Sequence, residues 1–249
     1  MPDSSPPRKP SARIALSTHW SELRLAAQAD SALPEAQNAF QGFCQRYWSA
    51  VFSVLRSRYP EAQAQDLTQQ FFLKHIIERE ALRKLDPERG SFRAWLYTAL
   101  SRFVIDEWRH STSAGRDHRV EHVLDERTSS APSMSVSSYE WHYANALAER
   151  ALCALHARWA PKFAGHKQGA HVDKPTLVSW LVDRDPQRIA AVLGIRPDNA
   201  RQTVRRLYVD LWQLLEAEIA QTVDAAQVAS ELEEICRILG VQSPGTADT

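Results

Sequence analysis

Apolar residues recur at helical spacing in several separate blocks of the chain. The clearest block covers residues 35–59, whose apolar positions lie close to the i, i+3/i+4, i+7 rule: Phe40, Phe43, Tyr47, Val51, Val54 and Leu55. A shorter block at residues 20–26 predicts a short helix before it. Residues 66–110 contain two more amphipathic helices, separated by the polar break at residues 86–90, which includes a Pro and a Gly. Together these blocks predict a compact helical bundle.

A second helical block covers residues 139–215, and a polar stretch separates it from the first. Residues 111–138 are dominated by Ser, Thr, Asp, Arg and His and have no apolar periodicity, which is typical of a linker. The chain has only 8 Gly and few alternating runs, so we expect an all-α fold with two helical domains joined by a flexible linker. The predicted segments are a disordered tail (1–17), a first domain (18–110), the linker (111–138), a second domain (139–215), and a C-terminal helical extension with its tail (216–249).

The end of the second block has the pattern of a helix-turn-helix. Residues 186–193 predict a short helix that Gly194 stops, and Pro197 suits the first turn of the next helix. Small residues such as Ala190 allow two helices to pack closely around a sharp turn. Arginine on the second helix can reach phosphates or guanine edges. An ordinary αα-hairpin with a solvated basic face is the alternative interpretation.

Composition limits the classes of function. The 30 Lys and Arg balance the 30 Asp and Glu, so any basic surface for nucleic acid must be local. The 3 cysteines lie far apart in the sequence, which argues against a disulfide framework or a zinc site. No apolar run approaches the roughly 18 residues that span a bilayer, and no signal-peptide pattern follows the start. We therefore expect a soluble, cytoplasmic protein without a metal, a cofactor or a membrane partner.

Residues 66–110 contain an ordered series of short motifs: Asp66-Leu67-Thr68-Gln69, Phe72-Leu73, Asp86 to Arg89, Ser91-Phe92-Arg93-Ala94-Trp95-Leu96, and Asp106 followed by Arg109. This series resembles region 2 of the extracytoplasmic-function (ECF) sigma factors, the promoter-recognising subunits of bacterial RNA polymerase. The helix-turn-helix lies where region 4 of such a factor is expected. Segments 20–27, 44–48, 66–72 and 218–223, with Glu231-Leu232, are similar to a subgroup that carries a C-terminal helical extension and is associated with Ser/Thr protein kinases.

The resemblance implies partners and roles. The helix that contains Asp66 is expected to bind the β′ coiled coil of the RNA polymerase core, and the helix at residues 92–110 to hold the unpaired strand of promoter DNA. The helix-turn-helix is expected to bind the minus-thirty-five element as duplex, in the major groove. The expected polymerase-binding residues are Asp66, Thr68, Gln69, Gln70, Phe72 and Lys74. The expected DNA-binding residues are Arg93, Arg102, Arg109, Arg116, Arg119, Arg196, Arg201, Gln202, Arg205 and Arg206.

The predicted polymerase-binding helix departs from its relatives in charge. Ordinary ECF factors carry several acidic residues here, whereas this chain has Gln63, Gln65 and Gln70, with Asp66 alone in the centre. Charge complementarity sets encounter rate and partner choice, so we expect weak docking by the unmodified helix. Phosphorylation of Thr68 would add about −1.5 to −2 charge at pH 7. The resulting hypothesis is that a Ser/Thr protein kinase activates the factor at Thr68; the alternative is that Thr68 is an ordinary helix-face residue.

Two other classes of protein compete with the sigma factor. A transcription regulator could bind DNA through the helix-turn-helix without being a polymerase subunit. An enzyme could use Asp106-Glu107, or His110 with His118 and His122, but these residues lie in or beside a polar stretch that offers no rigid frame. We therefore expect no catalytic residues.

Overall fold

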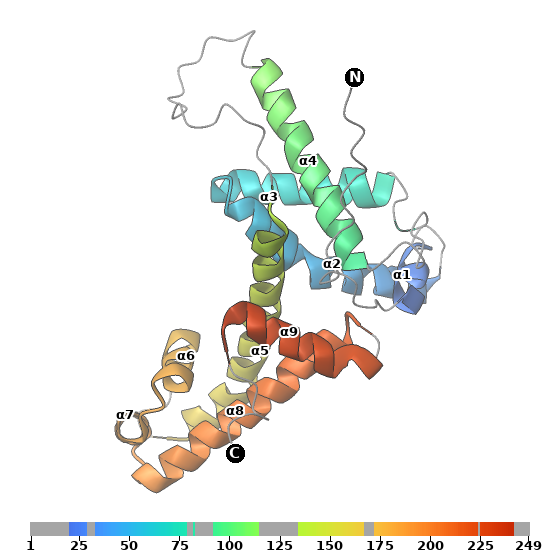
Figure 1. The fold of residues 1–249 in the computed structure, drawn as a ribbon. Coiled ribbons are helices and arrows are strands. Elements are labelled where there is room, and N and C mark those ends of the chain that lie inside the picture. Colours follow the sequence, from blue (N-terminus) through green and yellow to red (C-terminus); the bar gives the residue numbers. More distant parts are fainter. Residues whose placement is uncertain are drawn as a thin grey trace. The chain divides into compact units, whose positions relative to one another are not determined.

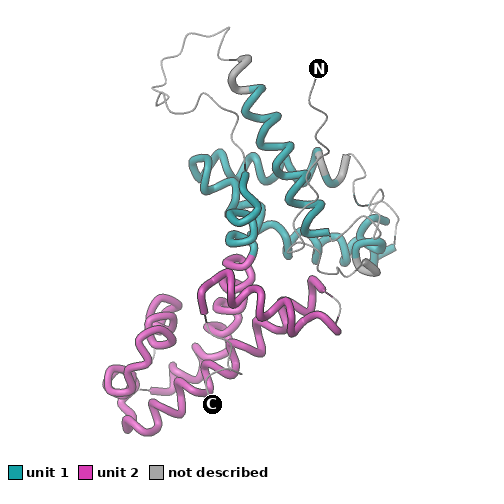
Figure 2. Tube along the Cα trace, viewed as in Figure 1, with its two compact units in different colours: residues 1–143 teal, residues 144–249 magenta. Residues whose placement is uncertain are grey.

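The described residues of the computed structural model are 20–28, 33–78, 82, 92–114, 134–166, 172–223 and 225–241. All regular structure within these ranges is helical, with no strand, which confirms the predicted all-α fold (Figure 1). The chain divides into two compact units, residues 1–143 and 144–249 (Figure 2). The division falls inside one helix, α5 (Val136–Ala164).

The described residues of unit 1 form the helices α1 to α4, the π-helical segment η2 and the start of α5. Helix α1 packs on α2, α2 packs on α3, and the π-helix η2 continues directly from α3 and contacts α4. Pro34 begins α2, where its missing N–H leaves no helical hydrogen bond unmade. The bounds are α1 Trp20–Ala26, α2 Pro34–Arg56, α3 Glu61–Gln70, η2 Phe71–Glu78 and α4 Phe92–Ala114.

A cluster of aromatic rings forms the core of unit 1. Phe43 of α2 lies 6.2 Å from Phe72 of η2 and 5.4 Å from Phe92 of α4, measured between ring centroids. Tyr47, one turn further along α2, lies 4.8 Å from Phe92. Phe71 adds a contact with Phe103 at 5.5 Å. Edge-to-face pairs at such distances add to the free energy of burial, so this aromatic cluster joins three helical segments.

The start of α5 completes the core of unit 1. The Tyr97 hydroxyl donates a hydrogen bond to the Met134 carbonyl oxygen at 2.7 Å, and the Tyr139 ring lies 5.5 Å from the Tyr97 ring. Tyr139 is fully buried. The helices therefore differ from the predicted linker, 111–138, at both ends, since α4 continues to Ala114 and α5 begins at Val136. The polar composition of residues 111–114 and 136–138 gave no apolar periodicity from which these helical ends could be predicted. The predicted tail and most of the predicted linker lie outside the described residues.

Unit 2 contains the remainder of α5 and the helices that follow it. A single core joins Trp159 and Phe163 of α5 to Trp180 of α6, Leu193 of α7 and Leu207 of α8. The predicted C-terminal extension begins within α8, which ends at Ala220, and a separate helix α9 then packs back on α8. The bounds are α6 Lys174–Asp183, α7 Pro186–Leu193, α8 Pro197–Ala220, a 3-10 turn Ala225–Gln227 and α9 Val228–Leu239.

Replacement of Phe43 by Ala tests the aromatic cluster. Phe43 is 2% exposed, and truncation of a core Phe typically costs about 3–5 kcal/mol of unfolding free energy. Urea denaturation should show this loss. Phe40→Ala, at a half-buried position one turn away in the same helix, is the matched control and should cost clearly less. Equal losses in the two variants would contradict the central place of Phe43.

The buried position of His142 predicts that the stability of unit 1 depends on pH. Its Nδ1 lies 2.7 Å from the Ser53 hydroxyl oxygen, and burial, with a smaller contribution from Arg58, lowers the pKa of its imidazole below the ordinary value near 6.5. The unfolded chain therefore binds a proton more readily than the folded chain. Unfolding free energy should fall as pH drops below about 6.5 towards the lowered pKa.

His142→Gln should flatten this pH dependence in denaturant titrations between pH 7 and pH 5. His110→Gln, at an exposed position of α4, serves as the control and should keep the slope of the unmodified protein. The same slope in His142→Gln as in that control would show that other groups cause the pH dependence.

Candidate functional site

The segment formed by α3 and η2 has one buried and one exposed face. Ala64, Leu67 and Phe71 point into the core of unit 1. The exposed side carries Asp66, Gln69 and Leu73, at positions i, i+3 and i+7, with Gln63, Gln65 and Lys74 beside them and Gln70 half-buried. Leu73 is a large apolar side chain and is 50% exposed. We call Asp66, Gln69, Gln70, Leu73 and Lys74 the amide stripe.

Two predicted polymerase-binding residues are part of the core instead. Phe72 is 4% exposed and its ring stacks on Trp48 at 5.4 Å. Thr68 is fully buried, and its hydroxyl donates a hydrogen bond to the Ala64 carbonyl oxygen at 2.6 Å. In this structure both side chains face the core of unit 1, so their contact with a partner stays a prediction that requires a local rearrangement. Ala64, Leu67, Thr68 and Phe71 follow the i, i+3, i+4, i+7 rule, so the hydrophobic pattern places Thr68 on the buried face, whereas the resemblance assigned it to the partner surface. The predicted contacts did not include Leu73, which is exposed.

Helix α4 presents part of the predicted basic surface. Arg102 and Arg109 are exposed, and Arg109 lies 3.7 Å from Asp106. Arg93 is 7% exposed, with its guanidinium carbon 5.1 Å from the centroid of the Tyr143 ring. The start of α5 therefore covers Arg93 in this structure, and its contact with phosphate stays a prediction. Arg116 and Arg119 lie outside the described residues.

The helix-turn-helix has the geometry that the sequence predicts. Asp185 caps α7, since its carboxylate accepts hydrogen bonds from the backbone N–H groups of Gln187 and Arg188. Gly194 ends α7 with φ +66°, a left-handed conformation that favours glycine. The N–H of Ile195 then donates to the carbonyl oxygen of Ala190 at 3.1 Å. These contacts define a tight turn, after which α8 begins at Pro197 and packs on α7.

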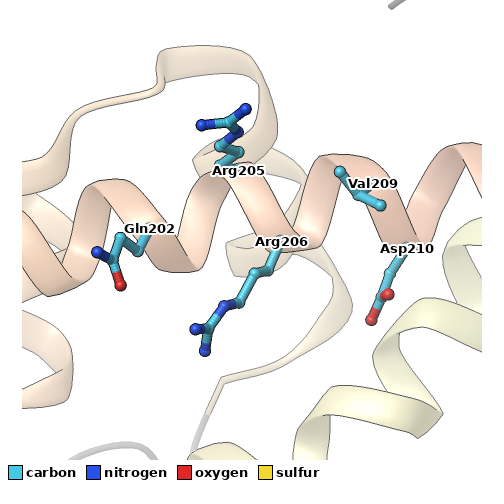
Figure 3. A pocket seen from close by; sticks show the side chains of 5 residues that line it. All are labelled: Gln202, Arg205, Arg206, Val209 and Asp210. Atoms are coloured by element: carbon cyan, nitrogen blue, oxygen red, sulfur yellow. The ribbon is translucent and has the colours of Figure 1, made fainter.

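One face of α8 carries exposed side chains suited to nucleic acid. Gln202, Arg205, Arg206 and Val209 follow the i, i+3, i+4, i+7 rule, are all exposed, and line a shallow hollow together with Asp210 (Figure 3). We call these first four residues the recognition face. Neither Arg205 nor Arg206 makes an ion pair with another described residue. Of the other predicted contacts, Arg196 is exposed, and Arg201 pairs with Asp198 at 2.9 Å.

Asp210 anchors α8 to the core of unit 2. Its Oδ2 accepts a hydrogen bond from the indole Nε1 of Trp159 at 2.7 Å, and its Oδ1 lies 3.7 Å from the Arg158 guanidinium. Two residues earlier, the Tyr208 hydroxyl donates to the Leu181 carbonyl oxygen at 2.5 Å, and Arg184 stacks over the Tyr208 ring at 4.4 Å. These polar contacts help to fix the rotation of α8, in which Gln202, Arg205 and Arg206 are exposed.

The structure offers little for metal or thiol chemistry. Within the ranges that the structure describes, no group of three His, Cys, Asp or Glu side chains could hold a metal ion. Cys44, Cys153 and Cys236 are free thiols, and burial raises the pKa of Cys44 to about 11, which disfavours its reactive thiolate. No helix in the described part of the chain has the length and apolar character needed to cross a membrane.

Replacement of Asp210 by Ala tests the anchor of α8. Trp159 is 7% exposed, and a buried donor that loses its acceptor typically costs about 1–3 kcal/mol. Asp210→Asn keeps an acceptor oxygen and should cost less, whereas Asp198→Ala removes only an exposed ion pair and should change stability by less than about 1 kcal/mol. Equal stability of Asp210→Ala and Asp198→Ala in urea titrations would contradict the anchoring role.

Comparison with known protein families identifies one matching region. Residues 43–113 match the family model described as Sigma-70 region 2. The match begins inside α2, at the centre of the aromatic cluster, and contains α3, η2 and nearly all of α4. No curated protein and no solved structure matched the chain. Over this part of unit 1 the chain is therefore similar to Sigma-70 region 2.

Proposed function

We propose that this protein is an alternative sigma factor of the ECF type, which directs RNA polymerase to specific promoters. The observation that carries the proposal is the match of residues 43–113 to Sigma-70 region 2. In this proposal, unit 1 binds the polymerase core and the melted minus-ten element. The helix-turn-helix of unit 2 binds the minus-thirty-five element as duplex, and residues 216–249 form an extension. A sigma factor of this kind acts in the cytoplasm and is not itself an enzyme.

The amide stripe is the proposed polymerase contact, and the β′ coiled coil is its proposed partner. Its surface is nearly neutral, with Asp66 and Lys74 at its two ends and amides between them. Burial of an exposed Leu side chain on binding contributes about 1.5–3 kcal/mol, and polar residues around it can exclude water from the contact. Leu73 has this arrangement, so it should contribute more affinity than the charges, and salt should weaken the complex only modestly.

The proposed contacts with melted DNA lie on α4. Arg102 and Arg109 are exposed and within about two turns of each other, so they can follow a phosphate backbone. The half-buried Trp108 lies beside Arg109. Stacking of a base on an aromatic side chain is worth about 1–3 kcal/mol. Trp95 instead packs against Phe92, with ring centroids 5.3 Å apart, which suits a core role.

We also propose that a Ser/Thr protein kinase activates the factor at Thr68, which requires that Thr68 first becomes accessible. The Thr68 hydroxyl is buried and bonded to Ala64, so a Ser/Thr protein kinase can reach it only after α3 opens locally. A phosphate cannot return to that apolar site without a large desolvation cost. Phosphorylation at Thr68 would therefore hold α3 in an altered arrangement and add charge beside the amide stripe. The kinase-associated ECF subgroup remains the resemblance that motivates this part.

A transcription regulator that binds DNA through α8 alone is the second candidate function. The tight turn at Gly194 and the exposed arginines of α8 are compatible with it. Binding to purified core RNA polymerase separates the two functions. A sigma factor binds the core and requires it for tight promoter binding. A regulator of this kind binds its operator as free protein and does not need the core.

Leu73→Ala should weaken binding to core polymerase about tenfold or more, as expected for a hot-spot side chain. Leu33→Ala is the matched control, because Leu33 is also apolar and equally exposed, at 49% against 50%. Fluorescence titration of labelled protein with core polymerase measures both affinities. No measurable core binding by the unmodified protein would contradict the sigma-factor proposal, and equal affinities of the two variants would contradict the assigned contact.

Thr68→Val and Thr68→Asp test the kinase hypothesis. Val removes the hydroxyl with nearly the same volume, so the fold should persist while activation by a Ser/Thr kinase is lost. Asp places a carboxylate at a fully buried position, so it should lower the unfolding free energy by about 2 kcal/mol or more. Kinase-treated protein should show faster amide exchange in α3. If kinase treatment activates the unmodified protein and Thr68→Val equally in transcription assays, Thr68 is not the activating phosphorylation site.

A further inference from the structure

The recognition face contains one apolar side chain among polar ones. Val209 is 50% exposed and lines the same hollow as Gln202, Arg205 and Arg206. Figure 3 shows Val209 and Arg205 on the same side of α8, as expected for residues four apart. We propose that Val209 is a specificity-determining residue that reads a thymine, by packing its methyl groups against the C5-methyl group in the major groove. This inference rests on the proposed function of α8 in duplex binding.

The spacing along α8 suits consecutive base pairs. A helix rises about 1.5 Å per residue, so Val209 lies about 10 Å beyond Gln202 along the axis. Stacked base pairs are about 3.4 Å apart along the duplex. A recognition helix lying along the major groove can therefore place Gln202 and Val209 about three base-pair steps apart, with Arg205 and Arg206 between them.

The chemistry of Val209 selects one base. Its side chain has no hydrogen-bond donor or acceptor, so it cannot pair with the polar edges of guanine, adenine or cytosine. Thymine alone presents a methyl group in the major groove. The neighbouring carboxylate of Asp210 would favour a cytosine amino group, but it is already bonded to Trp159 and lies near Arg158. The side chain at this end of the recognition face that is free to meet a base is therefore Val209.

Replacement of thymine by deoxyuridine, which lacks only the C5-methyl group, tests the inference. The full-length protein, bound to core polymerase, first selects ligands from random-sequence duplexes. Each thymine of a selected duplex is then replaced in turn. One replacement should weaken binding about fourfold, the effect of removing one buried methyl group. Val209→Ala should bind the thymine and deoxyuridine duplexes equally, and Val209→Thr, which keeps one methyl group, should retain part of the preference.

Val182→Ala is the matched control, because Val182 is also exposed, at 73%, but lies at the end of α6. It should leave the methyl preference unchanged. Sensitivity to the methyl group that persists in Val209→Ala, or no sensitivity at any thymine, would overturn the inference while the sigma-factor proposal stands. Failure of the complex to select any duplex would overturn both, so the two failures are distinguishable.

Discussion

The packing of Phe43 against Phe72 and Phe92 is the interaction on which unit 1 depends. It joins α2, η2 and α4 through rings 5.4 to 6.2 Å apart. Because this cluster buries one side of the segment formed by α3 and η2, it also determines which residues of that segment remain outside. The exposed amide stripe is therefore a consequence of the core.

In unit 2, contacts at both ends of the recognition face hold α8 in place. Gly194 and the cap at Asp185 define the turn before α8, and the Trp159 hydrogen bond to Asp210 holds α8 further along. The exposed residues between these anchors form the recognition face. The balanced charge of the whole chain is thus compatible with DNA binding, since the arginines that matter are concentrated on one short stretch.

Much of this fold follows from sequence patterns with strong physical causes. The helical periodicity of residues 35–59 predicted α2, and Gly194 with Pro197 predicted the helix-turn-helix. The burial of Arg93 has a different cause, because it requires Tyr143, fifty positions away, and local patterns do not contain such a long-range contact. Thr68 instead lies on the face that Leu67 and Phe71 mark as apolar.

The central claim is that this chain makes RNA polymerase start transcription at specific promoters. The most direct measurement is transcription from fragmented genomic DNA of the source bacterium by purified core polymerase, with and without the full-length protein. A sigma factor should produce transcripts from a discrete set of start sites, and these transcripts should appear only when the protein is present. The absence of such transcripts, together with tight operator binding by the free protein, would contradict this claim and favour a regulator.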